Sequence, residues 1–472
     1  MATEKKFRKF RAKFGVAHGL RARLVADNLP ATLCAAALMG LFGALATVVF
    51  RELLGWTQML LGGEDVPHGM VSLARGLDAW QRFLMPAAGG AIAGLILQMA
   101  ARWLPKRGAA DYMEAISIGR GVIGLRQTLA RSLSSIFSIG SGASIGREGP
   151  MVQLAAMFSS LTGRFLLLPP RHLRLLVACG ATAGITSAYN APIAGALFIS
   201  EIVFGVISSA TLVPLVVSSV VANIVTRQIL HYDAVFHMPH FEFVSGWEVI
   251  NYLGLGVAAG LVAPQFLRFL DLSRATFSRM PFPLWLRMAL GGLVVGALSV
   301  INPEVWGNGY SVVNSMLHTQ WAWQAVAAIL LMKIVATGAS VGSGAVGGVF
   351  TPTLFVGAAL GALYASGLQA VLPAGDVSAI SSYAVVGMGA LLAATTYAPL
   401  MSILMIFEMT LSYEVMLPLM LACITGYVIA HRIRPESVYA KSLANNERAQ
   451  LAVAKSALDK RENRAEPGKN IM

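Results

Sequence analysis

One adjacent pair of opposite charges, Arg147 and Glu148, lies inside a glycine-rich stretch of a very apolar chain. The stretch reads Gly140-Ser-Gly-Ala-Ser-Ile-Gly-Arg-Glu-Gly-Pro-Met151. A carboxylate in a hydrocarbon environment is costly and usually marks a functional pathway. The alternatives are that Glu148 pairs with Arg147 or caps a helix that starts at Pro150. The choice between these interpretations depends on the elements that surround the pair.

A second glycine-rich break, Gly342-Ser-Gly-Ala-Val-Gly-Gly-Val-Phe-Thr-Pro352, also ends in a proline. Proline suits the first turn of a helix, and glycines leave backbone N–H groups uncovered. A helix N-terminus carries unpaired donors and a partial positive charge, so it can bind an anion. If both helix starts meet at one anion site, ionised Glu148 would block that site and protonated Glu148 would vacate it. The pattern predicts a gate that takes up a proton, with Arg147 as an orienting or charge-balancing residue.

The composition is that of a chain surrounded largely by lipid. Of its 472 residues, 56% are hydrophobic and 12% are charged, and the mean hydropathy is +0.66. Soluble domains carry about 25% charged residues. Several apolar runs reach the ~20 residues that a membrane-spanning helix needs, including residues 30–50, 83–104, 252–270 and 321–339. We therefore expect an all-α polytopic membrane protein with about a dozen to eighteen apolar segments.

The net charge of +13 gathers at the two ends of the chain. Basic residues beside membrane segments remain in the cytoplasm, so both termini are expected there and the number of crossings is even. This distribution favours contact with membrane lipid over a nucleic-acid partner. We expect residues 1–28 to form a basic cytoplasmic arm, residues 29–443 the membrane domain, and residues 444–472 a polar cytoplasmic tail.

Three landmarks recur in the same order and indicate an internal repeat. The two glycine-rich breaks are 202 residues apart. Tyr189-Asn-Ala-Pro192, which is followed by Glu201, matches Tyr397-Ala-Pro399, which is followed by Glu408. The segment from Pro105 to Tyr112 matches the segment from Pro303 to Tyr310, and both offsets are similar to that of the glycine-rich breaks. Repeated halves with broken segments are typical of transporters. We expect halves at about residues 29–235 and 245–443, while the sequence leaves open whether they are parallel or inverted.

Metal, cofactor and catalytic signatures are weak. The three cysteines lie in or beside apolar runs with no disulfide or metal spacing, and the His231–His240 segment has no tight ligand spacing. No His-Glu-x-x-His motif occurs in the sequence. We expect no cofactor, no bound metal and no enzymatic activity, with a membrane-embedded enzyme as a remote alternative.

Two motifs and one tyrosine resemble the CLC family of chloride channels and proton-coupled chloride transporters. Gly146-Arg-Glu-Gly-Pro150 matches the family's GREGP motif, and Gly348-Val-Phe-Thr-Pro352 matches GxFxP. Tyr439 matches the tyrosine at the start of the family's last helix. The segments 110–115 and 306–310 are similar to the bacterial ClcB-like branch.

The resemblance implies a fold of two inverted repeats with about eighteen broken and tilted helices. It also implies a homodimer with one pore per subunit in the bacterial inner membrane, without the cytoplasmic regulatory domains of many members. Glu148 then becomes the gating glutamate. The residues implied to bind the anion are Gly146, Arg147, Gly149, Val349, Phe350 and Tyr439.

Two departures from the family pattern affect selectivity and coupling. The family's GSGIP serine has no counterpart, because this region reads Lys106-Arg-Gly-Ala-Ala110. At the position of the inner proton acceptor, next to Glu201, the chain has Ile202, which cannot carry a proton. We therefore predict a chloride or monovalent-anion channel that is gated by Glu148 and sensitive to voltage and pH. The alternative is a proton-coupled antiporter for chloride, nitrate or fluoride.

Overall fold

The computed structural model describes residues 15–62, 69–103, 111–229, 248–373, 377–441 and 443. Four regions that the sequence singled out fall outside these ranges: the basic arm before residue 15, the Lys106–Ala110 segment, the His231–His240 segment and the tail after residue 443. The described part is almost entirely helical, as predicted. Among its helices, eight are long and apolar enough to cross a membrane.

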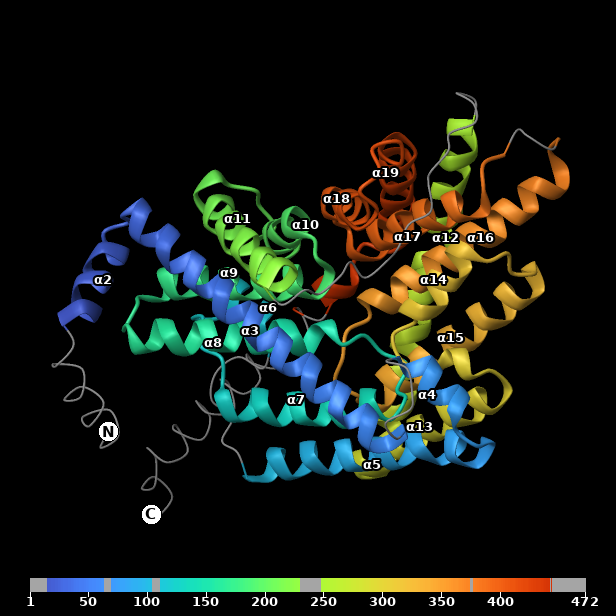
Figure 1. Cartoon of the computed structure of the whole chain (residues 1–472), viewed down its shortest axis with the longest axis horizontal. Helices are drawn as coiled ribbons and strands as arrows, with labels where there is room; N and C mark the ends of the chain where they lie inside the picture. The colour runs from blue at the N-terminus through green and yellow to red at the C-terminus, as the bar shows by residue number, and fades with distance from the viewer. Residues whose placement is uncertain are drawn as a thin grey trace, which may run out of the picture.

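The first half of the chain forms one series of helices (Figure 1). They are α2 (Gly15–Val25), α3 (Leu29–Gly62), α4 (Met70–Gly76), α5 (Ala79–Trp103), α6 (Tyr112–Ser117), α7 (Leu125–Gly140), α8 (Glu148–Phe165), α9 (Pro170–Tyr189), α10 (Pro192–Leu197), η1 (Phe198–Phe204), α11 (Ser209–Ile224) and η2 (Val225–Ile229). Here η1 and η2 are short π-helical segments.

The second half repeats the order of the main helices with fewer short segments. It contains α12 (Glu248–Arg279), α13 (Leu284–Ile301), the short η3 (Pro303–Val305), α14 (Tyr310–His318), α15 (Trp323–Ser343), α16 (Phe350–Val371), α17 (Ile380–Thr396), α18 (Pro399–Thr410) and α19 (Met416–Ile433). The four apolar runs chosen from the sequence lie in α3, α5, α12 and α15, so these helix predictions are confirmed.

Contacts between helices repeat as well, which shows that the two halves share one architecture. In the first half α9 packs against α8, α3 and α11, and in the second half α17 packs against α16, α12 and α19. Equivalent helices of the two halves also touch each other, because α5 packs on α13 and α10 packs on α18. Figure 1 shows α5 and α13 side by side along one edge. The halves are inverted repeats, as the sequence resemblance implied.

The landmarks of the repeat have matching backbone geometry. Gly142 and Gly344 both lie in the left-handed region, with φ of +112° and +108°. Glycine tolerates this conformation because it has no Cβ. Asn190 and Tyr397, each two residues before a helix-starting proline, share φ values of +55° and +59°. The ordered motifs therefore reflect equivalent turns and not chance similarity.

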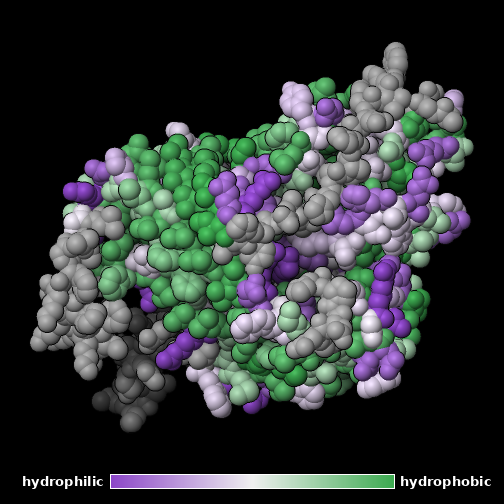
Figure 2. Space-filling view, in the orientation of Figure 1, coloured by the Kyte–Doolittle hydropathy of each residue, from purple (hydrophilic) through white to green (hydrophobic). Residues whose placement is uncertain are grey.

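Small residues allow the two halves to pack closely. A Cβ on Gly292 of α13 would lie 2.1 Å from the carbonyl oxygen of Pro86 on α5. Close backbone approach through small residues is how helices associate in a membrane. Outside these contacts the surface is rich in apolar side chains, and Figure 2 shows them covering broad areas over α3, α11 and α5. The chain is thus a multi-pass membrane protein.

Candidate functional site

The two glycine-rich breaks meet at the centre of the repeat. Gly146 and Gly348 exchange two backbone hydrogen bonds, with N···O distances of 2.8 and 2.9 Å, in an antiparallel bridge. Helix α8 begins at Glu148 and α16 begins at Phe350, so each proline lies in the first helical turn. A Cβ on Gly149 would lie 3.4 Å from the backbone nitrogen of Gly348. The two helix N-termini therefore face one another, as expected.

Glu148 is buried at this junction, with 5% of its surface exposed. Its Oε1 atom accepts a hydrogen bond from the Tyr310 hydroxyl at 2.9 Å and another from the Thr351 hydroxyl at 2.6 Å. Its Oε2 atom is buried and has no hydrogen-bond partner among the described residues. This carboxylate is thus held by the other half of the chain through one oxygen.

The second carboxylate oxygen lies directly over the paired glycines. A Cβ built on Gly146 would be 2.2 Å from Glu148 Oε2, and one on Gly348 would be 3.7 Å from it. A glycine at position 146 is therefore necessary for the carboxylate to lie where it does. Position 146 thus acts through the space that it leaves beside the carboxylate.

Arg147 does not neutralise its neighbour. Within the described ranges no ion pair joins Arg147 to Glu148, and the Arg147 guanidinium lies 5.8 Å from the centre of the Tyr310 ring. This cation–π contact orients the ring that carries the hydroxyl. Glu148 also makes no side-chain cap, since Arg147 occupies the N-cap position of α8. Both alternative interpretations of Glu148, pairing and capping, are therefore wrong.

An aromatic wall extends from the start of α16 to the C-terminal segment. The Phe350 ring centre lies 4.8 Å from that of Tyr189 and 6.2 Å from that of Phe198. Tyr439 meets Phe198 edge-on at 5.5 Å. Val349, the N-cap residue of α16, is 9% exposed. The structure thus brings Val349, Phe350 and Tyr439 to the same region as Glu148.

Glu201 and Glu408 have a reciprocal structural role that the sequence did not reveal. Glu201 accepts hydrogen bonds from the backbone nitrogens of Leu400 and Met401 at 3.3 and 2.8 Å, at the start of α18. Glu408 accepts them from Ile193 and Ala194 at 2.9 and 2.8 Å, at the start of α10. Each half therefore caps a helix of the other half with its own glutamate.

Ile202 lies next to the capping glutamate, on the π-helical segment η1. Its partly buried side chain packs against the main hydrophobic core. Because Glu201 is already engaged by two backbone N–H groups, this segment places no free carboxylate beside Ile202.

Sequence reasoning missed four polar side chains at Glu148 and at the turn before Tyr310. Three are the hydroxyls of Tyr310, Thr351 and Tyr189, with Tyr189 Oη 3.4 Å from Thr351 Oγ1. The fourth is Lys333, which is fully buried and donates to the carbonyl oxygens of Val305 and Gly307 at 2.9 and 2.7 Å. Tyr310 lies in the 306–310 segment and Thr351 in the Gly348–Pro352 motif, so their hydroxyls could have been recognised from the sequence as possible partners of Glu148.

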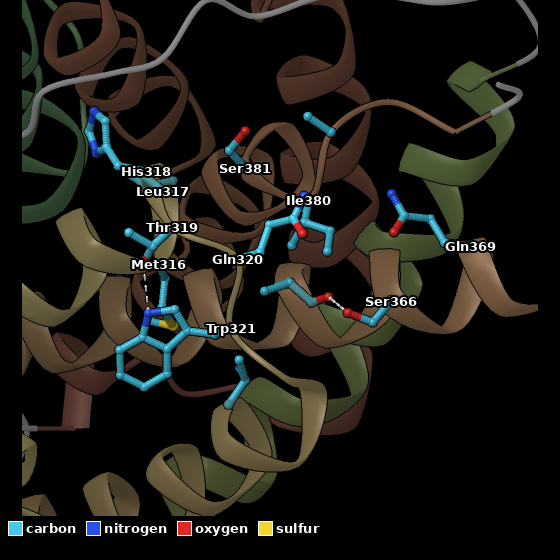
Figure 3. Close-up of a pocket in the computed structure, with 13 residues that line it drawn as sticks. Met316, Leu317, His318, Thr319, Gln320, Trp321, Ser366, Gln369, Ile380 and Ser381 are labelled. Carbon is cyan, nitrogen blue, oxygen red and sulfur yellow. Dashed lines mark hydrogen bonds between the residues drawn. The ribbon is translucent and has the colours of Figure 1, made fainter. Parts of the chain in front are cut away.

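A separate cavity of about 220 Å³ lies between the α14–α15 connection, α16 and the start of α17 (Figure 3). Its wall includes His318, Gln320, Trp321 and Gln369, and the Trp321 indole donates to Thr319 at 3.1 Å. No residue that contacts Glu148 lines this cavity. It contributes nothing to the chemistry at the two helix starts.

Comparisons with known proteins identify the family of the chain. The family model described as "Voltage gated chloride channel" matches residues 89–431. The chain belongs to the CLC family. A "Putative chloride channel protein ClcB-like" of Ralstonia nicotianae is 63% identical, covering 88% of this chain and 97% of the relative. The "Voltage-gated ClC-type chloride channel ClcB" of Escherichia coli is 40% identical, covering 87% and 98%. These relatives place the chain in the ClcB-like branch of the CLC family.

A solved CLC structure shows the same fold. It is described as a slow cyanobacterial Cl⁻/H⁺ antiporter and aligns with a TM-score of 0.77 at 25% identity, covering 88% of this chain and 97% of that one. Members of the CLC family transport anions such as chloride across membranes. Anion transport is therefore the general function of this chain.

Proposed function

We propose that this CLC protein conducts chloride and related monovalent anions passively and that the Glu148 side chain is the gate of its pore. The observation that carries the proposal is the position of the carboxylate at the junction of two helix N-termini. Helix N-termini favour negative charge, so the ionised side chain takes the place that a passing anion would need. Protonation removes its charge and frees that place.

The remaining predicted anion ligands fit this proposal. The first backbone N–H groups of a helix have no acceptor within that helix. The N–H groups of Val349 and Phe350, at the start of α16, can therefore face an anion. Gly146 and Gly149 keep side chains away from the junction, and Arg147 adds positive charge beside it. Tyr439 supplies a hydroxyl at the far end of the aromatic wall, where we assign it the inner anion contact.

Passive conduction is favoured by the surroundings of Ile202. Coupled exchange needs a route for protons from the inner side to Glu148, and an isoleucine cannot relay them. The adjacent Glu201 is engaged as a helix cap, so it is a poor substitute.

Proton-coupled exchange of chloride, nitrate or fluoride is the second candidate. It is favoured by a series of hydrogen bonds that joins the Tyr189 hydroxyl to the Thr351 hydroxyl and the Thr351 hydroxyl to the Glu148 carboxylate. The antiporter description of the 25%-identical structure points the same way.

Reconstituted liposomes distinguish the two candidates. Vesicles that contain the purified protein are loaded with chloride, and an outward gradient is imposed with no pH difference. Passive conduction predicts chloride efflux once a potassium ionophore balances charge, and no uphill movement of protons. Proton uptake that is driven by chloride efflux, in fixed proportion to it, would establish exchange and contradict the channel. Comparing chloride, nitrate and fluoride in the same vesicles gives the selectivity.

We further propose a homodimer with one pore in each subunit. Its support is an exposed apolar surface on α11 and α19, beside the reciprocally capped helices α10 and α18. Exposed side chains there include Val216, Val220, Leu417, Ile424 and Val428. Cross-linking in membranes, followed by flux measurement on mixed dimers with one Glu148→Gln subunit, tests this arrangement. Independent pores predict flux intermediate between the two pure forms.

The location and the limits of the domain are part of the same proposal. We place the membrane domain at residues 29–443 in a bacterial inner membrane, with both termini in the cytoplasm. The basic residues at the two ends of the chain support this orientation.

A further inference from the structure

We propose that the hydroxyls of Tyr310 and Thr351 form a clamp that holds ionised Glu148 in the blocking position. This hydroxyl clamp, defined by those two side chains, sets how acidic the medium must be before the gate opens. The inference rests on the proposed gating role of Glu148 and deepens it. Tyr310 and Thr351 are positioning residues, because they act on the anion through the Glu148 carboxylate.

The clamp acts on a single oxygen of the carboxylate. Tyr310 Oη and Thr351 Oγ1 lie 2.9 and 2.6 Å from Glu148 Oε1, and 3.2 Å from each other. Hydrogen bonds to a charged acceptor are roughly twice as strong as those between neutral groups. The clamp therefore stabilises the ionised side chain more than the protonated one.

The protons of the hydroxyl groups can all point toward the carboxylate. Tyr310 and Thr351 each have one hydroxyl proton, and each donates it to Oε1. Tyr189 can then donate its own proton to Thr351 Oγ1, 3.4 Å away. Oε2, which has no partner among the described residues, is the oxygen left to take up a proton. All of these hydroxyl protons have an acceptor when Glu148 is ionised.

The clamp joins the two halves of the chain. Glu148 opens α8 in the first half, while Tyr310 opens α14 and Thr351 lies in the first turn of α16 in the second half. When the carboxylate leaves, both bonds between the halves break together. Its position is thus coupled to the mutual placement of two helix starts.

Hydrogen bonds hold the backbone at and just before Tyr310. Lys333 binds the carbonyl oxygens of Val305 and Gly307, just before the Gly307–Gly309 turn. The Asn308 side chain accepts a hydrogen bond from the Tyr310 backbone nitrogen at 3.3 Å. The backbone that carries Tyr310 is therefore held by contacts that do not involve the carboxylate, which pre-organises the clamp.

The other titratable and charged groups around the carboxylate come from several elements. Tyr189 of α9, Tyr310 of α14 and Tyr439 of the C-terminal segment interact electrostatically with Glu148, and Arg147 acts on Tyr310 from the N-cap of α8. Tyr189 and Tyr439 remain in every variant below, so changes can be assigned to the clamp.

The test measures chloride efflux from liposomes as a function of pH, using the full-length protein. Tyr310→Phe and Thr351→Val each remove one hydroxyl with little change of shape. We expect either to raise the pH of half-maximal flux by about 1 unit, the scale of one charge-assisted hydrogen bond. At a pH above both midpoints, flux rises about tenfold. Thr351→Ser keeps the hydroxyl and should keep the wild-type profile.

The same changes in a Glu148→Gln background separate the clamp from the gate. With no ionisable gate, Tyr310→Phe and Thr351→Val should leave the pH profile flat and unchanged. The clamp is refuted if both variants keep the wild-type midpoint while Glu148→Gln abolishes pH dependence. It is also refuted if they lower maximal flux without moving the midpoint. If Glu148→Gln itself retains the wild-type pH profile, the gate proposal fails, and the clamp fails with it.

Discussion

Replacing Gly146 by alanine should hold the gate open. The added Cβ would lie 2.2 Å from Glu148 Oε2 and 2.9 Å from the carbonyl oxygen of Gly348. Ordinary contact needs about 3.5 Å. The carboxylate is the flexible end of a side chain, so it moves first, by about 1 Å. The paired backbone at Gly348 adjusts by a few tenths of an ångström.

The size of the effect follows from the two hydrogen bonds on Oε1. A displacement of about 1 Å takes both donors, now at 2.9 and 2.6 Å, beyond hydrogen-bond distance. Each bond to a charged group contributes about 1.5–3 kcal/mol. Losing about 3 kcal/mol disfavours the blocked conformation about 100-fold and raises the pH of half-maximal flux by about 2 units.

The assay is chloride efflux from liposomes between acid and mildly alkaline pH, with size-exclusion chromatography to confirm folding. Gly367→Ala, on α16 with open space around its Cβ, is the matched control and should match the wild type. In a Glu148→Gln background Gly146→Ala should add nothing. A folded Gly146→Ala protein with the wild-type pH profile would refute the argument from crowding.

Two further predictions concern charged residues outside the junction. Glu201→Ala and Glu408→Ala should each lower the free energy of unfolding by about 2–4 kcal/mol, because each leaves two backbone donors without an acceptor. Thermal unfolding in detergent measures this loss. An unchanged unfolding temperature for both variants would contradict the capping role of the two glutamates. Lys333→Met should raise the pH of half-maximal flux, because it removes the two hydrogen bonds that hold the turn before Tyr310. A midpoint at or below the wild-type value would show that Lys333 does not support the clamp.

Much of the architecture could be predicted because it depends on patterns of a few neighbouring residues. Apolar runs identified α3, α5, α12 and α15, and the ordered motifs identified the repeat. Tyr112 and Tyr310, paired by the weakest landmark, both begin short helices in equivalent positions. Local rules suffice for such features, since proline, glycine and hydrophobic length act within a few residues.

The contacts between the halves could not be predicted in the same way. Glu201 and Glu408 were recognised as a matching pair, but nothing local shows that each caps the other half's helix about 200 residues away. The clamp on Glu148 has the same origin, because Tyr310 and Thr351 are brought to it only by the packing of α14 and α16. Lys333 gave no signal beyond one charge in an apolar run.

The central claim is that Glu148 blocks the pore when ionised, and Glu148→Gln tests it most directly. The variant keeps the size of the side chain and mimics its protonated form. Chloride efflux from liposomes is measured for the variant and the wild type over the same pH range. The account predicts flux at least equal to the wild type at every pH, with little pH dependence. A correctly folded variant without flux, or one with the wild-type pH profile, would contradict it.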